Sequence, residues 1–240
     1  PTERAGDLDA QIGANVTGVR RLASMADAPI DEVVDYGERR MRAALAALPD
    51  GSWTATDVMD STGSAPAQQT PSVLVVTVTV TGDTVTVDFT GTAPQSGGNV
   101  NAVAAVTDSA VGFAIRSVVD PTMPANGGAM RPIEVIAPAG SIVAAVAPAA
   151  VGAGNVEVSQ RVADLVLAAL ASAAPERVAA ANQGTMNNVL IGGGGPVGGD
   201  AWVYYETVGG GQGGRGPRDD LRAQAGQSGI QTGMTNTKNT

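Results

Sequence analysis

The sequence predicts an α+β fold in which an N-terminal helix pair precedes an antiparallel sheet and further helices packed on that sheet. Residues 1–50 carry apolar side chains at helical spacing, and residues 75–91 alternate β-branched with polar residues around a Gly-Asp turn. The later segments alternate between helical and strand patterns, which is typical of a mixed α and β domain. We therefore divide the chain into a helical pair, residues 1–50, and a mixed α/β region of the same domain, residues 51–240.

The helical pair begins with an apolar stripe whose members are three or four residues apart: Leu8, Ile12, Val16, Val19 and Leu22. Asp7 is expected to cap this first helix. The second helix should have Pro29 in its first turn and end at Pro49-Asp50-Gly51. Its predicted buried face consists of Ile30, Val33, Val34, Met41, Leu45 and Leu48. Two successive amphipathic helices indicate an antiparallel pair.

Residues 75–91, VVTVTVTGDTVTVDFTG, predict a β-hairpin with a two-residue turn at Gly82-Asp83. That turn places apolar residues opposite one another, in the pairs Val80–Val85, Val78–Val87 and Val76–Phe89. All six then lie on one face of the sheet, and the other face carries Thr77, Thr79, Thr86 and Asp88. A shift of one residue would break this match, so burial fixes the register.

Helices and strands alternate after the hairpin. Residues 101–121 predict a helix that ends at Asp120-Pro121, and residues 131–138, RPIEVIAP, predict a short strand. Residues 151–173 begin with glycines and continue as a strongly apolar helix. After a segment rich in Asn and Gly, residues 201–208, AWVYYETV, predict another strand.

The composition excludes several classes of function. The chain contains no Cys and no His, so disulfides, thiol nucleophiles and imidazole bases or ligands are absent. A formal net charge of −9, with 14 basic residues, lacks the basic surface of a nucleic-acid-binding protein. No apolar stretch free of charge and Gly reaches membrane-spanning length. Catalysis would have to use Asp, Glu, Lys, Tyr, Ser or Thr, and the lack of Cys favours a cytoplasmic location.

One glycine motif, Gly209-x-Gly211-x-x-Gly214, follows a predicted strand, as a dinucleotide fingerprint would. The fingerprint also needs a helix immediately afterwards, to direct its N-terminus at the pyrophosphate. Gly216 and Pro217 argue against a helix at that point. A flexible loop, or a loop that covers a substrate, is therefore the better interpretation.

A second motif, Gly152-x-Gly154, leads into a helix that Asn155 is expected to cap. Free backbone N–H groups at such a helix start could face an anion. Glu157 stands where the dinucleotide pattern has its third Gly, and its charge would oppose a phosphate. An ordinary capped helix with tight glycine packing and a turn that faces a ligand are both compatible with these residues.

Amide and hydroxyl side chains gather next to a predicted strand, at Asn182, Gln183, Thr185, Asn187 and Asn188. Such groups suit hydrogen bonding to a neutral amide or carbonyl, and they equally suit a plain turn. The Arg pairs at 20–21 and 39–40 fall on the two N-terminal helices. They are interpreted as solvated faces or intrachain ion pairs.

Eight motifs occur along the chain in a fixed order: GDLDAQIGAN, YGERRMRAALAALPDG, VTVDFTGTAPQ, GAMRPIEVIAPAGS, AGNVEVSQRVAD, NQGTMNN, YYETVGGGQG and MTNTKNT. Together they resemble the hydantoinase B/oxoprolinase family over essentially all 240 residues, as a fragment or shortened member. The family comprises β subunits of ATP-dependent hydantoinases, including N-methylhydantoinase, the C-terminal half of 5-oxoprolinases, and α subunits of acetone and acetophenone carboxylases.

The resemblance implies that the chain works in a hetero-oligomer with a hydantoinase A-type subunit. That partner uses ATP to phosphorylate the oxygen of a lactam, imide or ketone, and the B-type subunit takes the activated species to hydrolysis or carboxylation. No cofactor is evident on this chain, and the resemblance implies that ATP is bound by the partner subunit. Three roles stay open: part of a cyclic-amide hydrolase acting on hydantoin-like or oxoproline-like rings, part of a ketone carboxylase, and a non-catalytic scaffold for the complex.

The same resemblance, with the residue types, gives a candidate site. Glu157 is the candidate catalytic residue, because it is the only acid or base among the residues considered. The candidate substrate-binding residues are Asn155, Gln160, Asn182, Gln183, Asn187, Asn188, Gly209, Gly210, Gly211, Thr235 and Asn236. No metal-binding residue is predicted on this chain.

The chain departs from the family pattern in three places. The family's Asp- and His-containing metal motifs lie upstream of the GDL helix, so the resemblance places a divalent metal on that upstream part. Gln231 and Gly233 stand where the family usually has two His before MTNT, and the chain ends at Thr240 where the family usually continues. We therefore expect the isolated chain to be inactive.

Overall fold

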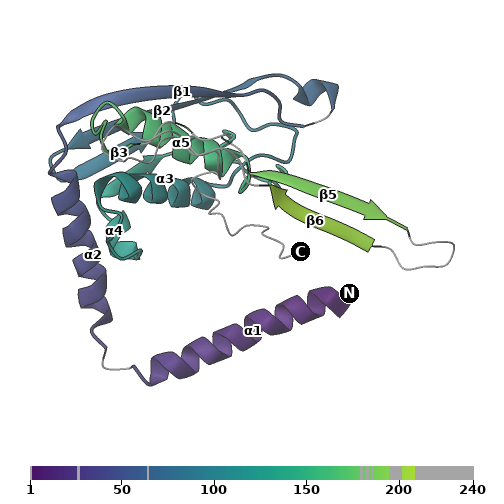
Figure 1. Cartoon of the computed structure of the whole chain (residues 1–240), viewed down its shortest axis with the longest axis horizontal. Coiled ribbons are helices and arrows are strands. Elements are labelled where there is room, and N and C mark those ends of the chain that lie inside the picture. Colours follow the sequence, from purple (N-terminus) through teal and green to yellow (C-terminus); the bar gives the residue numbers. More distant parts are fainter. Residues whose placement is uncertain are drawn as a thin grey trace.

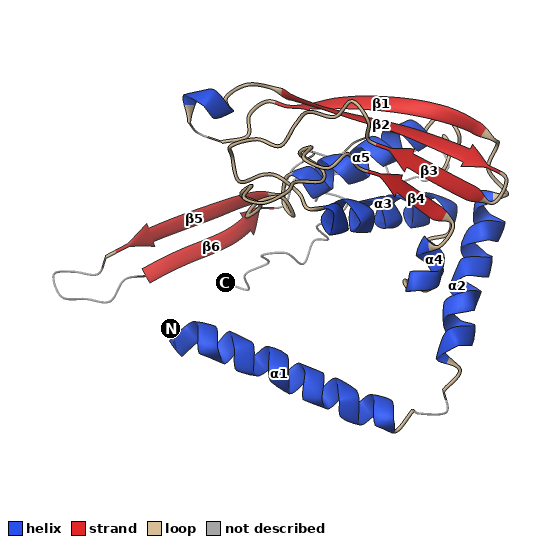
Figure 2. Ribbon diagram, turned by 180° about the vertical axis from the view of Figure 1, so that it is seen from behind, coloured by secondary structure: helices blue, strands red, loops and turns tan. Residues whose placement is uncertain are grey.

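The computed structural model describes residues 2–25, 28–63, 65–178, 181, 184, 186–194 and 202–208. Its helices are α1 (Thr2–Ala23), α2 (Ile30–Leu45), α3 (Ala104–Val119), α4 (Gly127–Met130) and α5 (Val158–Leu170), with a 3₁₀ turn at Pro66–Gln68. Its strands are β1 (Gly51–Met59), β2 (Ser72–Thr81), β3 (Thr84–Asp88), β4 (Ile133–Ile136), β5 (Asn187–Gly193) and β6 (Trp202–Val208). Figures 1 and 2 show a sheet with α3 and α5 on one face.

The main sheet has four strands in the order β1-β2-β3-β4. β1 pairs with β2 and β2 with β3 in the antiparallel sense, whereas β3 and β4 are parallel. The parallel pair follows from the connection, because α3 lies between β3 and β4 in the chain and returns it to the same end of the sheet. The predicted α+β class is confirmed.

The predicted hairpin register is also confirmed. Val78 lies opposite Val87 and Val80 opposite Val85, across a turn in which Gly82 has a φ of +57°. Left-handed backbone of this kind suits glycine, which has no Cβ to clash. The four valines are at most 1% exposed, so the face that the sequence assigns to the core is the buried one.

The opposite face of the sheet is polar. Hydroxyl groups of neighbouring strands form hydrogen bonds of 2.9 Å in the pairs Ser52–Thr79 and Thr54–Thr77. Cross-strand hydroxyl pairs of this kind stabilise a sheet by a few tenths of a kcal/mol to about 1 kcal/mol each. One face of the sheet is therefore polar, and the side chains on the other face pack against helices.

Helices α3 and α5 pack against each other, and α5 also packs on β1 and β2. Their inward side chains, among them Val111, Ile115 and Val166, are completely buried beside the valines of the hairpin. The helix predicted over residues 101–121 and the strand predicted over residues 131–138 are both present.

Strand β1 was not predicted. Its nine residues pair with β2 along their full length, and its inward positions alternate as Trp53, Ala55, Asp57 and Met59. A small and a charged residue interrupt the apolar alternation that marks a strand. The charged residue is tolerated because a helix supplies its partner, as described below.

Helix α2 is buried over only part of its length. Met41 and Leu45 are at most 1% exposed and pack into the core, as predicted. Ile30 and Val33 are 53% and 52% exposed, so the N-terminal half of the predicted buried face is wrong. That half extends beyond the sheet (Figure 1), where α4 packs against α2 beside Val34 and leaves Ile30 and Val33 open.

Ion pairs anchor α2 to the segments beside it. Arg131, just after α4, contacts Asp35 at 2.7 Å and Glu38 at 2.8 Å. Arg40 pairs with Asp120 at the end of α3, which confirms one of the ion pairs considered for the Arg residues of this helix. The Arg131 contacts hold α2 beside α4, and the Arg40 contact ties it to the end of α3.

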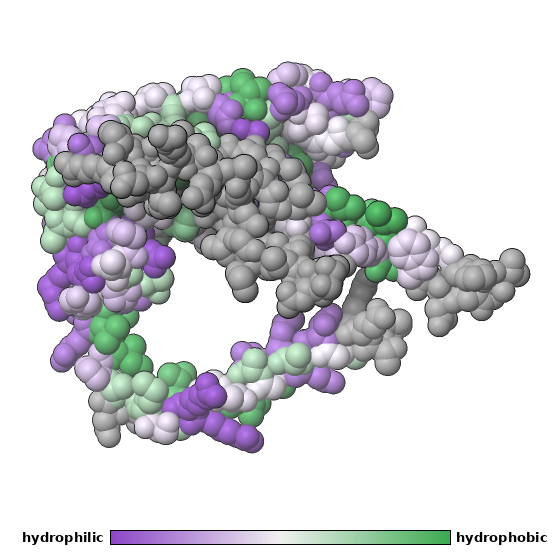
Figure 3. Space-filling model, in the orientation of Figure 1, coloured by the Kyte–Doolittle hydropathy of each residue, from purple (hydrophilic) through white to green (hydrophobic). Residues whose placement is uncertain are grey.

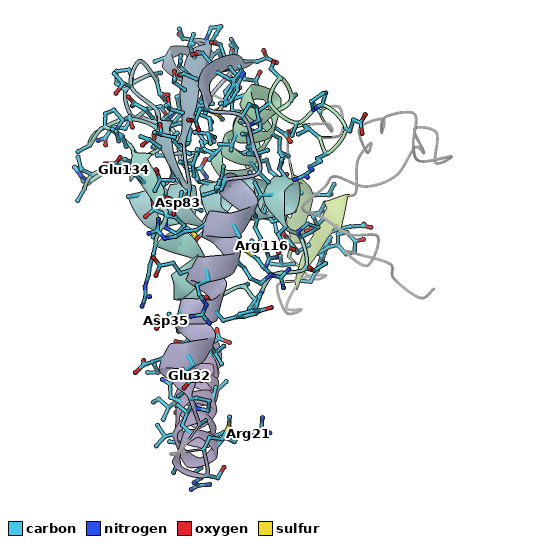
Figure 4. The ribbon with its side chains drawn as sticks, turned by 90° about the vertical axis from the view of Figure 1, so that its left-hand side faces the viewer. Arg21, Glu32, Asp35, Asp83, Arg116 and Glu134 are labelled. Carbon is cyan, nitrogen blue, oxygen red and sulfur yellow. The ribbon has the colours of Figure 1, made fainter. Side chains whose placement is uncertain are left out.

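Helix α1 is present but diverges from the rest of the molecule. It begins at Thr2 instead of after Asp7, because the residues before Asp7 include Ala5 and Glu3, which both favour helices. The predicted antiparallel packing on α2 is wrong: the two helices splay apart, and Arg21 lies far from the sheet (Figures 1 and 4). The whole apolar stripe from Leu8 to Leu22 is between 44% and 67% exposed.

Strands β5 and β6 form a second, two-stranded antiparallel sheet that projects from the body (Figure 1). Its apolar side chains are open, with Leu190 70% and Val203 73% exposed. In the space-filling view, exposed apolar residues gather on the small β5–β6 sheet and along α1 and the start of α2 (Figure 3). The strand predicted over residues 201–208 corresponds to β6.

Candidate functional site

The turn that precedes α5 is fixed to the loop in front of α3. The Ala153 N–H donates to the Asn99 carbonyl over 2.8 Å, and a Cβ at position 154 would overlap the Asn101 carbonyl oxygen. Gly154 therefore allows two backbones to approach closely. The second glycine of the predicted motif has this packing role.

The cap of α5 differs from the prediction. The helix starts at Val158, and Glu157 occupies the N-cap position without a side-chain capping hydrogen bond. Asn155, the predicted cap, is exposed and lies two residues earlier, because an additional tight turn separates it from the helix. In that turn the N–H groups of Val156 and Glu157 both donate to the Ala153 carbonyl. These amides are already used and are not free for an anion.

Glu157 is half-buried at the start of α5. Burial raises the pKa of its carboxyl group, and the positive charge of Arg161 opposes this only in part. A carboxyl group with a raised pKa retains its proton to higher pH and can donate it in a reaction. Glu157 thus has the electrostatic property that the predicted acid role requires.

Arg161 and Asp57 form an ion pair next to Glu157 that the sequence did not reveal. The Arg161 Nη1 and Asp57 Oδ2 atoms are 2.6 Å apart, and the two side chains are 22% and 35% exposed. The pair joins α5 to β1 across the inner face of the sheet. The available signal was an acid at an inward position of β1, on the face that it shares with Met59.

Gln160 lies in the first turn of α5 and is completely buried. Within the part of the chain that the structure describes, neither its amide nitrogen nor its amide oxygen has a hydrogen-bond partner. Leaving a buried polar group unsatisfied costs about 1–3 kcal/mol. Such groups in a native protein call for an explanation, and a functional role is a common one.

The start of β5 lies against the start of α5. The Met186 N–H donates to the Val156 carbonyl over 3.0 Å, which brings Asn187 and Asn188 close to the turn that carries Glu157. Asn187 pairs with Val208 in the small sheet. The described end of the amide-rich segment, residues 186–188, therefore lies beside the turn before α5, about 30 residues earlier in the chain.

The side chain of Asn188 is occupied within the small sheet. Its Oδ1 accepts hydrogen bonds from the Tyr205 hydroxyl at 2.7 Å and the Thr207 hydroxyl at 2.9 Å. Its Nδ2 donates to the Met186 carbonyl at 3.0 Å. In this arrangement Asn188 ties β5 to β6.

The other predicted site residues lie outside the described residues: Asn182, Gln183, Gly209, Gly210, Gly211, Thr235 and Asn236. The positions of Gln231 and Gly233 lie outside them as well. The described part of the site therefore consists of Asn155, Glu157 and Gln160 at the start of α5, with Asn187 and Asn188 beside them.

No group of three or more Asp or Glu residues in the described ranges could hold a metal ion. The divalent metal implied by the family resemblance thus has no matching ligand set in these ranges. Among the helices that the structure describes, none is long and apolar enough to cross a membrane.

Asn101, which was not predicted, holds two loops together next to the site. It is completely buried, and its Oδ1 accepts from the Ser96 N–H at 2.7 Å. Its Nδ2 donates to the Gly98 and Ala150 carbonyls at 2.9 and 2.8 Å. These bonds fix the loop before α3 to the chain just before the 152–154 turn. Asn is common in Gly-rich loops, so its presence at this position carries no distinct signal in the sequence.

Comparison with known proteins gives consistent matches. The family model for hydantoinase B/oxoprolinase matches residues 1–240. The chain is 33% identical to 5-oxoprolinase 1 of Arabidopsis thaliana over 260 aligned positions, which include 99% of the chain and 19% of that protein. It is 32% identical to the B subunit of a putative D-/L-hydantoinase from Pseudomonas sp. (strain NS671), with 98% of the chain and 40% of that relative covered.

A solved structure shares the fold as well. The ATP-dependent caprolactamase from Pseudomonas jessenii superposes with a TM-score of 0.74 at 26% identity, over 92% of the chain and 40% of the caprolactamase chain. The chain thus spans two fifths or less of the length of each of these three proteins.

Proposed function

Since the chain belongs to the hydantoinase B/oxoprolinase family, we propose that it forms part of the β-type subunit of an ATP-dependent cyclic-amide hydrolase. Its substrate would be a lactam or hydantoin-like ring whose amide oxygen an A-type partner has phosphorylated. The observation that carries this proposal is the 3.0 Å hydrogen bond from the Met186 N–H to the Val156 carbonyl, because it joins the amide-rich segment to the turn that holds Glu157. The caprolactamase and the hydantoinase among its relatives support a cyclic amide as substrate.

The chemistry requires an acid at the ring nitrogen. A ring amide is a poor electrophile, and phosphorylation of its oxygen makes the carbon open to attack by water. The resulting tetrahedral adduct opens when the ring nitrogen leaves with a proton, and the acyl phosphate that remains takes up a second water to give a carboxylate and phosphate. Glu157, whose pKa burial raises, is the described residue suited to supply that proton.

The amides around Glu157 would orient the ring. Gln160 offers a donor and an acceptor, neither of which has a partner in the described ranges, and because its side chain is completely buried it would support the position of the helix start that carries Glu157. Asn155 is exposed at the edge of the same turn. Asn188 would act indirectly, by holding β5 against β6.

A reconstituted complex with an A-type subunit tests the proposal. We expect Glu157→Gln to lower lactam ring opening by about 10²-fold or more, the usual contribution of a general acid. Glu134→Gln is the matched control (Figure 4). Glu134 lies on β4, at one edge of the sheet, whereas α5 packs on β1 and β2 at the other edge. Unchanged ring opening in Glu157→Gln would contradict the role.

A non-catalytic scaffold is the second candidate, because the Asn188 side chain bonds to Met186, Tyr205 and Thr207 and so helps to build the small sheet. In that case the chain would form a stable complex with the A-type subunit without any turnover of lactam. A ketone carboxylase subunit would instead show bicarbonate-dependent, ketone-stimulated use of ATP. The same reconstitution distinguishes the three.

A further inference from the structure

Glu157 and Arg161 are four residues apart at the start of α5, an arrangement that favours an ion pair on the helix surface. The structure departs from this expectation. Arg161 directs its Nη1 to Asp57 of β1, 2.6 Å away, and Glu157 has no ion pair with any described residue. The acid at the helix start is thus left without the counter-ion that the helix itself provides.

Asp57 binds the Arg161 guanidinium, and the backbone at Gly184 lies close to it. Asp57 lies on the inward face of β1, opposite Leu74 of β2, so it reaches α5 from the sheet. Gly184 approaches from another side: a Cβ there would be 2.8 Å from Arg161 Nη1, and its φ of +78° also favours glycine. A rotation of the arginine toward Glu157 would give up the Asp57 contact.

We propose that Asp57 is a positioning residue that draws Arg161 toward β1 and so keeps Glu157 free of its helical counter-ion. The importance of this for catalysis rests on the proposed role of Glu157 as an acid. The ion pair and the unpaired acid themselves involve only Asp57, Arg161 and Glu157, which lie on β1 and α5.

The arrangement explains why burial dominates at Glu157. Among the described residues, Arg161 is the charged group whose field acts on this carboxyl, and it opposes the effect of burial only in part. Because the Arg161 charge is shared with Asp57, Glu157 retains a raised pKa. If Arg161 turned to Glu157, the same charge would favour the ionised carboxylate and remove the acid.

Titration of the Glu157 carboxyl by ¹³C NMR tests the proposal without any turnover. The Glu157→Gln variant assigns the signal, and the pKa is then measured in the parent chain, Asp57→Asn, Arg161→Gln and the double variant. We expect Asp57→Asn to lower the pKa of Glu157 by about one unit, because the released guanidinium can approach it. Arg161→Gln should raise the pKa.

The double variant separates two explanations. Asp57→Asn also removes a negative charge, which by itself would lower the pKa of a nearby acid. If Asp57 acts through Arg161, adding Asp57→Asn to Arg161→Gln should change the pKa by no more than about 0.3 unit, which is about the error within which independent effects add. Asp57→Glu, which keeps the carboxylate, should leave the pKa of Glu157 at the parent value. Asp60→Asn, which removes an acid just beyond β1, should also leave that pKa unchanged.

Two results would overturn the proposal: no change of the pKa in Asp57→Asn, or an equal fall with and without Arg161. Amide NMR spectra establish that each variant is folded, and Asp57→Ser serves in place of Asp57→Asn if that variant does not fold. Failure of the proposed function is distinguishable, because it would show as unchanged ring opening in Glu157→Gln while the pKa cycle still holds.

Discussion

The main sheet and helix α1 both show regular apolar periodicity, but these apolar side chains are buried in the sheet and exposed on α1. In the hairpin, Val78 and Val87 are completely buried, whereas Leu8 and Val16 on α1 are 56% and 44% exposed. The body has a second layer for its apolar face, because α3 and α5 return over the sheet. Periodicity therefore predicts which side of an element is apolar, but the presence of a cover depends on the chain topology.

The two regions also use glycine differently. Gly154 in the body lies where a Cβ would overlap another backbone, whereas Gly6, Gly13 and Gly18 on α1 have nothing within 4 Å of an added Cβ. A glycine inside a helix weakens it by about 1 kcal/mol relative to Ala. Within the described residues, α1 therefore has neither a buried apolar face nor a strong intrinsic preference to support it.

The largest contrast should appear in a matched pair of leucine truncations. Leu74→Ala in β2, a fully buried position, should lower the free energy of unfolding by about 2–5 kcal/mol. Leu8→Ala on α1 should change it by no more than about 0.5 kcal/mol. Urea unfolding of the two variants measures both values. A comparable loss in Leu8→Ala would mean that the α1 stripe is buried in solution.

Two glycine-to-alanine substitutions compare the same two regions, with a smaller expected change in the free energy of unfolding. Gly154→Ala should lower the free energy of unfolding by about 1–3 kcal/mol, because the new methyl group must displace the Asn101 backbone. Gly13→Ala should instead increase the helix content seen by far-UV circular dichroism, with no loss of stability. A destabilised Gly13→Ala chain would indicate that something packs closely on α1.

The smallest expected effect concerns pH and compares two carboxyl groups. The folded-state pKa of Glu157 is raised, mainly by burial, so the folded chain binds more protons there than the unfolded chain. Its contribution to stability is present below the ordinary pKa of glutamate and is lost as the pH rises through the raised pKa. Glu157→Gln should remove this loss.

Asp120 should behave in the opposite way. Its hydrogen bond from Thr122, and then that from Arg40, lower the pKa of its carboxyl group. The stability that it contributes is present above the ordinary pKa of aspartate and is lost as the pH falls through the lowered pKa. Across pH 3 to 8, the unfolding curves should therefore differ from the parent at the high-pH end and in opposite directions, with Asp120→Asn less stable and Glu157→Gln more stable, and both should approach the parent as the pH falls. Parallel curves would contradict both assignments.

The elements with a clear local pattern could be predicted from the sequence. The hairpin register followed from valines on both sides of Gly82-Asp83, and the end of α3 followed from Asp120-Pro121. β1 could not be predicted, because its inward Asp57 makes sense only with Arg161 opposite it, 104 residues later. The Asn155 cap failed for a local reason: one more turn precedes the helix than the spacing of its residues indicates.

For the candidate site, the sequence indicated the elements on which some of the proposed residues lie, and whether these residues form a functional site stays a prediction. Glu157 and Gln160 do lie at the start of α5, and Asn187 and Asn188 lie near them. The arginine and aspartate that control the charge of Glu157 were not found, because only the tertiary fold joins β1 to α5. A polar cluster built by one helix and two separate strand segments has no signature in a single stretch of sequence.

The central claim is that Glu157 protonates the leaving nitrogen of a phosphorylated ring. The most direct test is the ratio of ring opened to ATP cleaved in the reconstituted complex, with parent chain and Glu157→Gln measured side by side. We predict that lactam-dependent ATP cleavage continues in Glu157→Gln while the ratio falls by about 10²-fold, because activation occurs on the partner and ring opening needs the acid. An unchanged ratio would contradict the claim.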